Sequence, residues 1–383
     1  MLDVNSLVRE CGEFRLETIS VTRVCIPLVE HFRISSGEVR VKDALLVRVS
    51  EGDAFGWGEA SAMPGSFYSP ETPDSCQSDL IGHLVPVLLG QRFGSIIDLN
   101  DRVKQLSQNR FARTALETAA WELLARRQGV SLRQLMGFPE VTIRSGLGVG
   151  LHGTEEELIS AIRRQWSDGY HRLKIKIKRG QDISLVEAVR RSMGDIPLFV
   201  DANADYARND FNVFRALDTY GLLMFEQPLP KEDLEGAALL QKQVQTPICL
   251  DEGVETEEDA RRAIASGSCR IVNIKLQRVG GFLEALRIAR VCEDHGIGLW
   301  VGTMPELGVG AAAALVLASC PAFAFPTDVE PSHRWYENDV VSPPLKLSQG
   351  CHLIPPGPGL GYDVDPGIVS HYEVAKWHFP ANN

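Results

Sequence analysis

Five charged residues stand at the ends of five short apolar segments in the middle of the chain. The segments RLKIK, PLFVD, LLMFE, TPICLD and IVNIK end at Lys176, Asp201, Glu226, Asp251 and Lys275. Successive charges lie 25, 25, 25 and 24 residues apart. A single acidic residue after a strand is most often a helix cap or a solvated loop residue. Five charged side chains at equivalent strand ends are costly to bury unless they form ion pairs with one another or bind a metal ion.

The three central residues of this series are carboxylates. Carboxylates that meet at one point raise each other's pKa, and a hard divalent cation relieves the repulsion. Three acidic oxygens, completed by water and substrate oxygens, suit Mg²⁺. Zinc prefers His and Cys ligands, which do not recur at these segment ends. The sequence therefore predicts that Asp201, Glu226 and Asp251 bind a divalent metal ion.

Two lysines flank the acidic residues along the chain. Lys176 and Lys275 are expected to face each other across the metal, where a lysine has a lowered pKa and can act as a general base. Lys174 alternates onto the same side of its strand as Lys176, so each ammonium is expected to disfavour protonation of the other. A carboxylate substrate held by Mg²⁺ has a more acidic α-proton. The predicted chemistry is therefore abstraction of a proton next to a carboxylate through an enediolate, followed by inversion or loss of a β leaving group.

For these five side chains to meet at one site, the five segments must be parallel strands of one sheet that end at the same edge. From about residue 143, amphipathic stretches of helical period alternate with apolar segments at residues 145–151, 172–177, 197–202, 222–227, 246–252, 271–276, 298–303 and 323–328. Eight strands with short helical connections are typical of a (β/α)8-type barrel, whose active site lies at the carboxyl ends of the strands. A doubly wound sheet is the alternative, but its G-x-G-x-x-G turn followed by a helix does not appear after the first strand.

The regions on either side of the barrel pattern have a different organisation. Residues 15–60 alternate as strands do, and residues 86–137 change to helical spacing that ends at Gly129. The tail combines Pro and Gly with aromatic side chains. We therefore expect an α+β capping domain over residues 1–140, a barrel with the active site over 141–340, and a segment over 341–383 that returns to the capping domain.

Charge and hydropathy restrict the classes of partner. The formal net charge of −11 argues against nucleic acid, because phosphate binding needs a basic face. The sequence contains no run of eighteen apolar residues, so a membrane span is not expected. The mixed, acidic N-terminus lacks the features of a secretion signal. The expected protein is cytoplasmic and acts on a small-molecule carboxylate.

The sequence resembles the enolase superfamily, in its muconate-lactonising subgroup. The resemblance covers nearly the whole chain and rests on the K-x-K of LKIKIKRG, the DAN of FVDANADY, the FEQP of LMFEQPLP, the LDE of ICLDEG and the NIK of IVNIKLQRVGG. Within the subgroup it is most similar to the branch of N-succinylamino acid racemases and o-succinylbenzoate synthases, through the loop segments HFRISSG and MPGSFYSPE and the stretch TDVEPSHRWYENDVV. The resemblance implies an α/β protein with a modified TIM barrel, (β/α)7β, beneath an N-terminal α+β capping domain.

The resemblance also implies a role for each site residue. Asp201, Glu226 and Asp251 would bind Mg²⁺, or Mn²⁺ or another divalent ion in its place, and Lys176 and Lys275 would be the acid/base pair. Side chains expected to bind substrate or to support these five are Lys174, Asn203, Glu252, Arg278, Met304, Glu306, Ser36, Met63 and Tyr68. Among these, Arg278 would lie beside the second lysine and tune it.

Two departures from the family pattern concern the substrate. Gly253 stands where a serine is common, and Leu307 stands where a small hydroxylated residue is more usual. Both are expected where substrate side chains are recognised. The function favoured by the resemblance is racemisation of N-acylamino acids, especially N-succinylamino acids, by a homo-oligomer that is a dimer or larger. The alternatives are o-succinylbenzoate synthase activity, alone or in addition, then dipeptide epimerase or muconate cycloisomerase, and last a non-catalytic relative.

Overall fold

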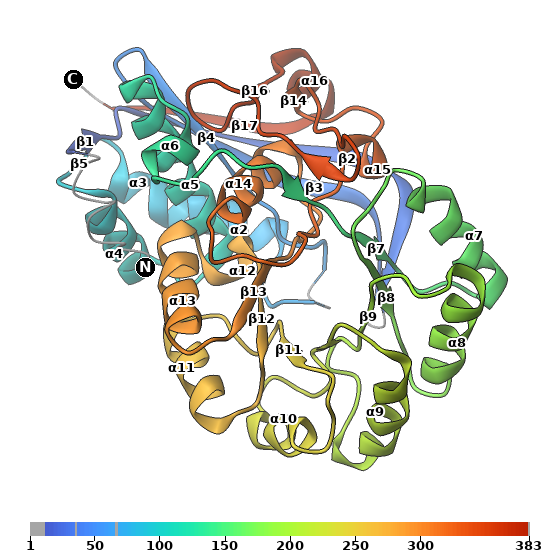
Figure 1. The fold of residues 1–383 in the computed structure, drawn as a ribbon. Helices are drawn as coiled ribbons and strands as arrows, with labels where there is room; N and C mark the ends of the chain where they lie inside the picture. Colours follow the sequence, from blue (N-terminus) through green and yellow to red (C-terminus); the bar gives the residue numbers. More distant parts are fainter. Residues whose placement is uncertain (1–11, 35–36, 66–67, 382–383) are drawn as a thin grey trace.

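A parallel sheet of seven strands forms the centre of the molecule. The computed structural model describes residues 12–34, 37–65 and 68–381 (Figure 1). The sheet runs in chain order through β7 (Leu147–Val149), β8 (Leu173–Lys176), β9 (Leu198–Asp201), β10 (Phe225–Glu226), β11 (Ile248–Leu250), β12 (Ile271–Ile274) and β13 (Gly298–Val301). Sequential order leaves no topological switch point, so the doubly wound alternative is excluded and the curled sheet of a barrel is confirmed.

The structure corrects one part of the predicted pattern: residues 323–328, the expected eighth strand, do not form a regular strand. This segment carries only one isolated bridge, between Ser145 and Thr327. It still lies between the two edges of the sheet, because Asp328 N donates to Val301 O over 3.0 Å and Thr327 N donates to Arg144 O over 2.9 Å. Pro326 has no N–H to give to a ladder, which explains the irregular backbone. The barrel is therefore closed by backbone hydrogen bonds without a regular strand.

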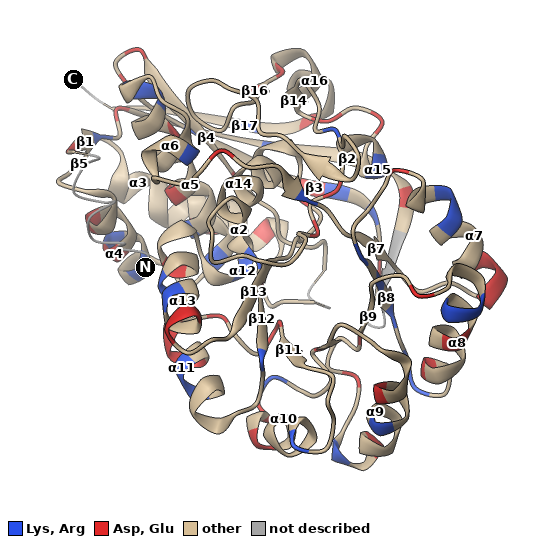
Figure 2. Ribbon diagram, in the orientation of Figure 1, with Lys and Arg blue, Asp and Glu red and all other residues tan. Residues whose placement is uncertain are grey.

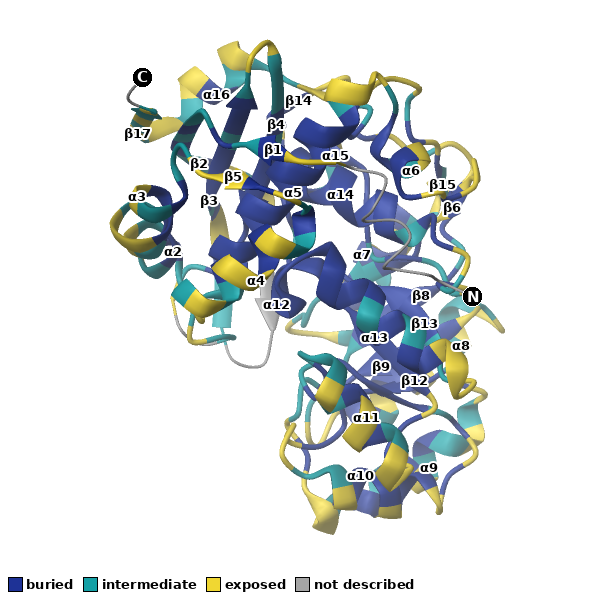
Figure 3. Ribbon diagram, turned by 90° about the vertical axis from the view of Figure 1, so that its left-hand side faces the viewer, coloured by how far each residue is buried: buried dark blue, intermediate teal, exposed yellow. Residues whose placement is uncertain are grey.

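Helices cover the outer face of the curled sheet. The seven helical stretches expected from the sequence are confirmed as α7 (Glu155–Trp166), α8 (Asp182–Met193), α9 (Phe211–Leu217), α10 (Leu234–Gln241), α11 (Glu257–Ser266), α13 (Phe282–Asp294) and α14 (Gly308–Ala318). Two short helices, α12 (Leu276–Val279) and α15 (Ser332–Trp335), lie in the connections at the carboxyl ends of the strands. Charged side chains are carried by the outer helices (Figure 2), whereas the sheet beneath them is buried (Figure 3).

An antiparallel sheet, with the helices that pack on it, forms the second unit, called the capping unit below. Its order is β17 (Glu373–Pro380), β2 (Thr18–Ile34), β3 (Gly37–Glu51) and β4 (Ala54–Ala60), so a strand from near the C-terminus pairs with the first long strand. Helix α5 (Arg110–Gln128) packs on β4, and a Cβ atom at Gly56 or Gly58 would collide with its backbone. The two glycines of the GWG motif thus permit close helix–strand contact.

Shorter elements complete the chain. The remaining helical elements are α2 (Pro73–Asp79), η1 (Leu80–Leu84), α3 (Val85–Leu88), α4 (Ile96–Leu106), α6 (Leu132–Leu135), η2 (Arg208–Asp210), η3 (Asp218–Tyr220) and α16 (Pro366–Tyr372). Two-residue strands pair as β1 (Phe14–Arg15) with β5 (Arg92–Phe93), β6 (Ile143–Arg144) with β15 (Cys351–His352), and β14 (Val341–Ser342) with β16 (Asp363–Val364). None of the helices in the described ranges has the length and apolar character needed to cross a bilayer.

The two units are joined at the start of α14. Its N-cap residue, Leu307, has no side chain that can accept a hydrogen bond. Buried Glu59 of β4 accepts from the N–H groups of Leu307 and Gly310, at 2.8 and 2.7 Å, and Asp339 accepts from Gly308 N at 2.8 Å. Helix N-termini need such acceptors, and carboxylates also suit the helix dipole. The capping unit therefore supplies the cap that the barrel helix lacks.

Replacing Glu59 with alanine is expected to lower the free energy of unfolding by about 3 kcal/mol, because two buried N–H groups lose their acceptor. Thr154→Ala is the control: Thr154 caps α7 at an exposed helix end, and its loss is expected to cost about 1 kcal/mol. Urea denaturation of both variants beside the wild type measures the difference. A loss for Glu59→Ala no larger than that for Thr154→Ala would contradict this capping role.

Candidate functional site

Strand register brings the charged strand ends together. Lys176 pairs with Asp201, and Asp201 pairs with Glu226, across β8, β9 and β10. Asp251 and Lys275 directly follow β11 and β12, which continue the same sheet. Five residues from separate parts of the chain therefore lie along one edge of the sheet, the carboxyl ends of its strands, as the spacing in the sequence predicts.

Asp201 lies between a lysine and the backbone of its own loop. Its side chain is 1% exposed, and Lys176 Nζ lies 2.5 Å from its Oδ2. The same ammonium donates to Asn203 Oδ1 over 2.7 Å, while Asn203 N donates to Asp201 Oδ1 over 2.9 Å. The positive φ of 43° at Asn203 permits this turn, which asparagine adopts more readily than most residues. The Asp-Ala-Asn motif thus places a carboxylate and an amide oxygen on one lysine.

Glu226 is the carboxylate with the fewest partners. It is fully buried, and its Oε1 accepts from Asn273 Nδ2 over 2.7 Å. Its Oε2 accepts no hydrogen bond, and the Lys174 ammonium is 3.4 Å away. Burial, together with the negative charge of Asp201, raises the pKa of Glu226 to about 8. A buried carboxylate with a free oxygen is energetically unfavourable unless a cation approaches it.

Asp251 is held by two cations. Lys275 Nζ donates to its Oδ2 over 2.9 Å, and the guanidinium of Arg278 contacts both of its oxygens. Burial favours the neutral acid, but Arg278 and Lys275 outweigh it and hold the pKa of Asp251 well below its usual range. Arg278 therefore lies beside Lys275 as expected, and the two cations share Asp251 as a partner.

Tyr68 reaches this group from the capping unit. Its hydroxyl accepts a hydrogen bond from Lys275 Nζ over 2.7 Å and another from Arg278 Nη2. It lies 3.4 Å from Asp251 Oδ2, to which it can donate. Burial raises the pKa of Tyr68 well above its usual value, so the group is a neutral phenol. Tyr68 thus gives the ammonium of Lys275 a second acceptor, adjacent to Asp251.

The expectation that Lys174 is less readily protonated because Lys176 is near is wrong. Lys174 is buried and faces Asp328, with Glu226 at 3.4 Å and Asp201 at 3.9 Å. Burial lowers the pKa of Lys174, but the nearby carboxylates, Asp328 first, outweigh it and raise that pKa well above its usual value. Alternation along β8 predicted a shared side but could not show that carboxylates surround the first lysine. In this structure Lys174 is a firmly protonated counter-charge.

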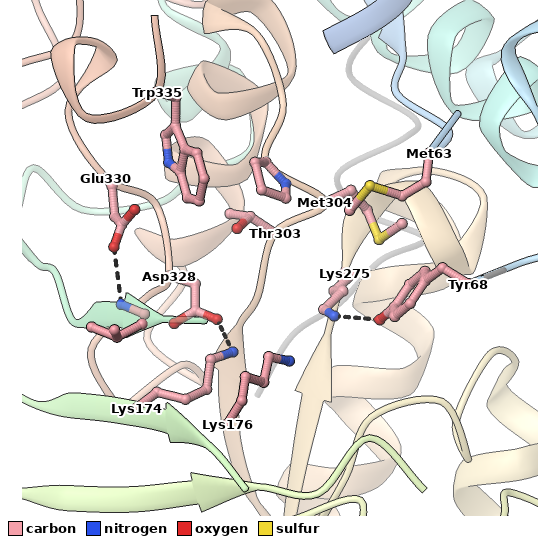
Figure 4. Close-up of a pocket in the computed structure, with 13 residues that line it drawn as sticks. Met63, Tyr68, Lys174, Lys176, Lys275, Thr303, Met304, Asp328, Glu330 and Trp335 are labelled. Carbon is pink, nitrogen blue, oxygen red and sulfur yellow. Dashed lines mark hydrogen bonds and ion pairs between the residues drawn. The ribbon is translucent and has the colours of Figure 1, made fainter. Parts of the chain in front are cut away.

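A cavity lies above these strand ends (Figure 4). Six of the expected side chains line it, namely Met63, Tyr68, Lys174, Lys176, Lys275 and Met304. Seven lining residues were not expected, namely Gly148, Val149, Thr303, Pro305, Asp328, Glu330 and Trp335. Val149, Thr303 and Asp328 lie within strand segments already recognised, and Glu330 follows the last of them, so the rule that found Lys176 also points to this part of the site. Trp335 and Pro305 carry no such signal.

Other expected residues lie outside the cavity lining. Glu252 accepts a 3.4 Å hydrogen bond from Asn203 Nδ2, and Asn203 in turn accepts one from Lys176, so Asn203 links Glu252 to this lysine. Glu306 is buried, and its Oε2 has no hydrogen-bond partner. Ser36 lies outside the described residues. Gly253 and Leu307 are not among the described residues that line this cavity, and their expected place in substrate recognition stays a prediction.

The carboxylates match a divalent cation in chemistry, although they are engaged by other groups. Within the described ranges, no group of three or more His, Cys, Asp or Glu side chains is arranged to hold a metal ion. Lys176 holds Asp201, and Lys275 and Arg278 hold Asp251, which accounts for this arrangement. Three buried carboxylates in electrostatic contact, one with a free oxygen, are still donors that suit a hard cation such as Mg²⁺.

Two family models match the chain. The model for the N-terminal domain of the mandelate racemase / muconate lactonizing enzyme family matches residues 17–137. The model described as enolase C-terminal domain-like matches residues 157–368. The first match contains strands β2, β3 and β4 of the antiparallel sheet, and the second contains all five charged strand ends.

Relatives match over nearly their whole length. An o-succinylbenzoate synthase of Geobacillus kaustophilus is 39% identical over 358 residues, 93% of this chain and 96% of the relative. An N-succinylamino acid racemase of Amycolatopsis sp is 39% identical over 363 residues, 94% of this chain and 98% of the relative. The crystal structure of an enolase superfamily member from Listeria innocua superposes with a TM-score of 0.91 at 34% identity, covering 96% of this chain and all of that one. This chain therefore belongs to the mandelate racemase / muconate lactonizing enzyme family of the enolase superfamily.

Proposed function

We propose that this enzyme racemises N-acylamino acids by moving the α-proton through an enediolate. The observation that carries the proposal is the placement of Lys176 and Lys275 in one cavity, with Asp201, Glu226 and Asp251 on the three strands between them. The identity with an N-succinylamino acid racemase over almost the whole chain supports an N-acyl substrate, with N-succinylamino acids as the first to test.

We further propose that Asp201, Glu226 and Asp251 hold Mg²⁺, with Mn²⁺ or another divalent ion as a substitute. When bound, the ion supplies a positive charge that acidifies the α-proton of a carboxylate and stabilises the enediolate. Glu226 Oε2 accepts no hydrogen bond, and the pKa of this carboxyl is raised despite Lys174 at 3.4 Å; both support this assignment, because a bound cation would remove both costs. Lys174, paired with Asp328 close to Glu226, limits the net negative charge around the carboxylates.

The lysines carry the proton in this proposal. Lys176 Nζ takes the α-proton from one face, and Lys275 Nζ returns a proton to the other face, which inverts the centre. Asn203 and Asp201 fix the first ammonium at 2.7 and 2.5 Å, and Tyr68 and Asp251 fix the second at 2.7 and 2.9 Å. Each lysine therefore has one carboxylate and one neutral acceptor, which keeps its Nζ directed at the cavity.

A second activity at the same site is o-succinylbenzoate synthesis, a syn elimination of water. It is favoured by the 39% identity to the Geobacillus synthase. In that reaction Lys176 would act as both base and acid, and Lys275 would stay protonated and stabilise the enediolate as a cation. The close contact of Lys275 with Asp251 suits this second role equally well, so one site serves both reactions. Cytoplasmic location and assembly into a homo-oligomer complete the proposal.

Replacing Lys275 with alanine is expected to abolish racemisation, with a loss of at least about 10³-fold in kcat/KM, because one of the two bases is removed. Circular dichroism of N-succinylamino acids measures the loss, while exchange of the α-hydrogen with deuterated water, which Lys176 can still catalyse from one enantiomer, reports on the remaining base. Lys242→Ala, at an exposed position after α10, is the control and should retain full activity. A Lys275→Ala enzyme that still racemises at the wild-type rate would refute the two-base assignment.

Removal of divalent ions with a chelator is expected to abolish α-hydrogen exchange, and added Mg²⁺ is expected to restore it. Mg²⁺ should also raise the melting temperature, because an ion that binds only the folded chain stabilises it. Glu226→Gln removes one charged ligand and should weaken both effects, whereas Glu232→Gln, in the exposed loop before α10, should change neither. Equal Mg²⁺ stabilisation of the wild type and Glu226→Gln would exclude this ligand set.

A further inference from the structure

A buried lysine lies where the capping unit meets the barrel. Lys42 of β3 is 2% exposed and does not line the cavity. Its ammonium donates to two backbone carbonyl oxygens, Ser61 O at 3.1 Å and Met304 O at 3.3 Å. A buried ammonium is costly and needs partners in fixed positions. The mechanism proposed above does not use this residue.

The two carbonyls belong to different units, Ser61 to the segment after β4 and Met304 to the barrel. Ser61 follows β4 and lies two residues before Met63, on the segment that leads to Tyr68. Met304 lies in the loop between β13 and α14 of the barrel. The side chains of Met63 and Met304 both line the cavity, and Figure 4 shows them on the same side of it, next to Tyr68. One ammonium thus joins the backbones that carry two apolar lining residues.

Further hydrogen bonds hold the Ser61 segment and the Met304 segment in place where the two units meet. Gln277 of α12 accepts from Ser61 N over 3.1 Å and donates to Glu59 O over 2.8 Å. Tyr336 donates to Pro305 O and Glu306 O, at 3.1 and 3.0 Å. Two charged groups join these anchored segments to each other: Glu59 through the N–H groups of Leu307 and Gly310, and Lys42 through the carbonyls of Ser61 and Met304.

Two buried carboxyl groups provide the electrostatic setting. Glu59 is 1% exposed and Glu306 is 5% exposed, and both act on Lys42 by charge. Burial raises the pKa of Glu59 to about 7 and also raises that of Glu306. Burial lowers the pKa of Lys42, and the charges of Glu59 and Glu306 oppose that shift. The three side chains are therefore electrostatically coupled in the junction, and removing Lys42 leaves the two buried acids without their shared partner.

We propose that Lys42 is a positioning residue that sets the spacing of Met63 and Met304 and thereby the preference for substrates with large apolar side chains. Methionine pairs adapt to irregular apolar groups, so the distance between their backbones limits which side chains they can enclose. The inference rests on the proposed function for its substrates. It assigns no chemical step to Lys42, so a substrate with a small side chain should be turned over without its help.

The test compares N-succinylphenylalanine with N-succinylalanine as substrates of Lys42→Met. We expect the ratio of their kcat/KM values to fall about tenfold, the size of effect of an imperfect apolar fit, through a higher KM for the phenylalanine substrate. Lys104→Met is the matched control, because Lys104 of α4 pairs with Glu284 of the barrel helix α13 at 2.5 Å, away from the cavity lining. It should leave the ratio unchanged.

A purely structural role predicts a different pattern. It would lower the active fraction and reduce both substrates equally, and that result, or an unchanged ratio, would overturn the proposal. If Lys42→Met does not fold, the double variant Lys42→Met/Glu306→Gln removes one uncompensated buried charge and carries the same test.

A crystal structure of the variant provides a measurement that needs no turnover. We expect the Met304 and Ser61 carbonyls to separate, with Lys176 and Asp201 unmoved. Unmoved carbonyls would refute the positioning role, whether or not the wild type racemises these substrates. A wild type that racemises neither substrate would count only against the proposed function.

Discussion

The carboxylates of Asp201, Glu226 and Asp251 are buried at the carboxyl ends of adjacent strands, where little water can screen them. Each is compensated differently: Asp201 by Lys176, Asp251 by Lys275 and Arg278, and Glu226 only by Lys174 at 3.4 Å. This distribution of charge determines much of the surrounding structure. Lys174 is itself held by Asp328, which binds Arg172 at 2.6 Å, so the ion pairs extend to the segment that closes the barrel.

The capping unit contributes to the same network from above. Tyr68 contacts Lys275 and Arg278, while Glu59 caps α14 and Lys42 bridges Ser61 and Met304. All of these groups are polar or charged side chains that would be costly to bury on either unit alone. The contact between cap and barrel is therefore specific in a way that apolar packing alone would not be, because each buried polar group requires its partner on the other side.

The spacing of charged strand ends was sufficient to predict the parallel sheet, its helices and the grouping of the five central residues, because one βα unit has a nearly constant length. Three features could not be predicted in this way. The closing segment at 323–328 lost its regular ladder to Pro326, which the apolar pattern hides. The partners of Lys174 depend on Asp328, far along the chain. Trp335 enters the cavity from α15, a four-residue helix outside the strand–helix alternation.

The pairing of β17 with β2 has a consequence for synthesis. The long strand β2 is synthesised before the barrel strands, whereas its edge partner β17 is synthesised after them. Until then β2 presents unpaired backbone groups on one side, the situation in which strands pair with other chains. A nascent or truncated polypeptide lacking residues 373–380 would carry an open sheet edge directly above the barrel. Pairing of β17 with β2 must therefore follow synthesis of the barrel segment that lies between them in the chain.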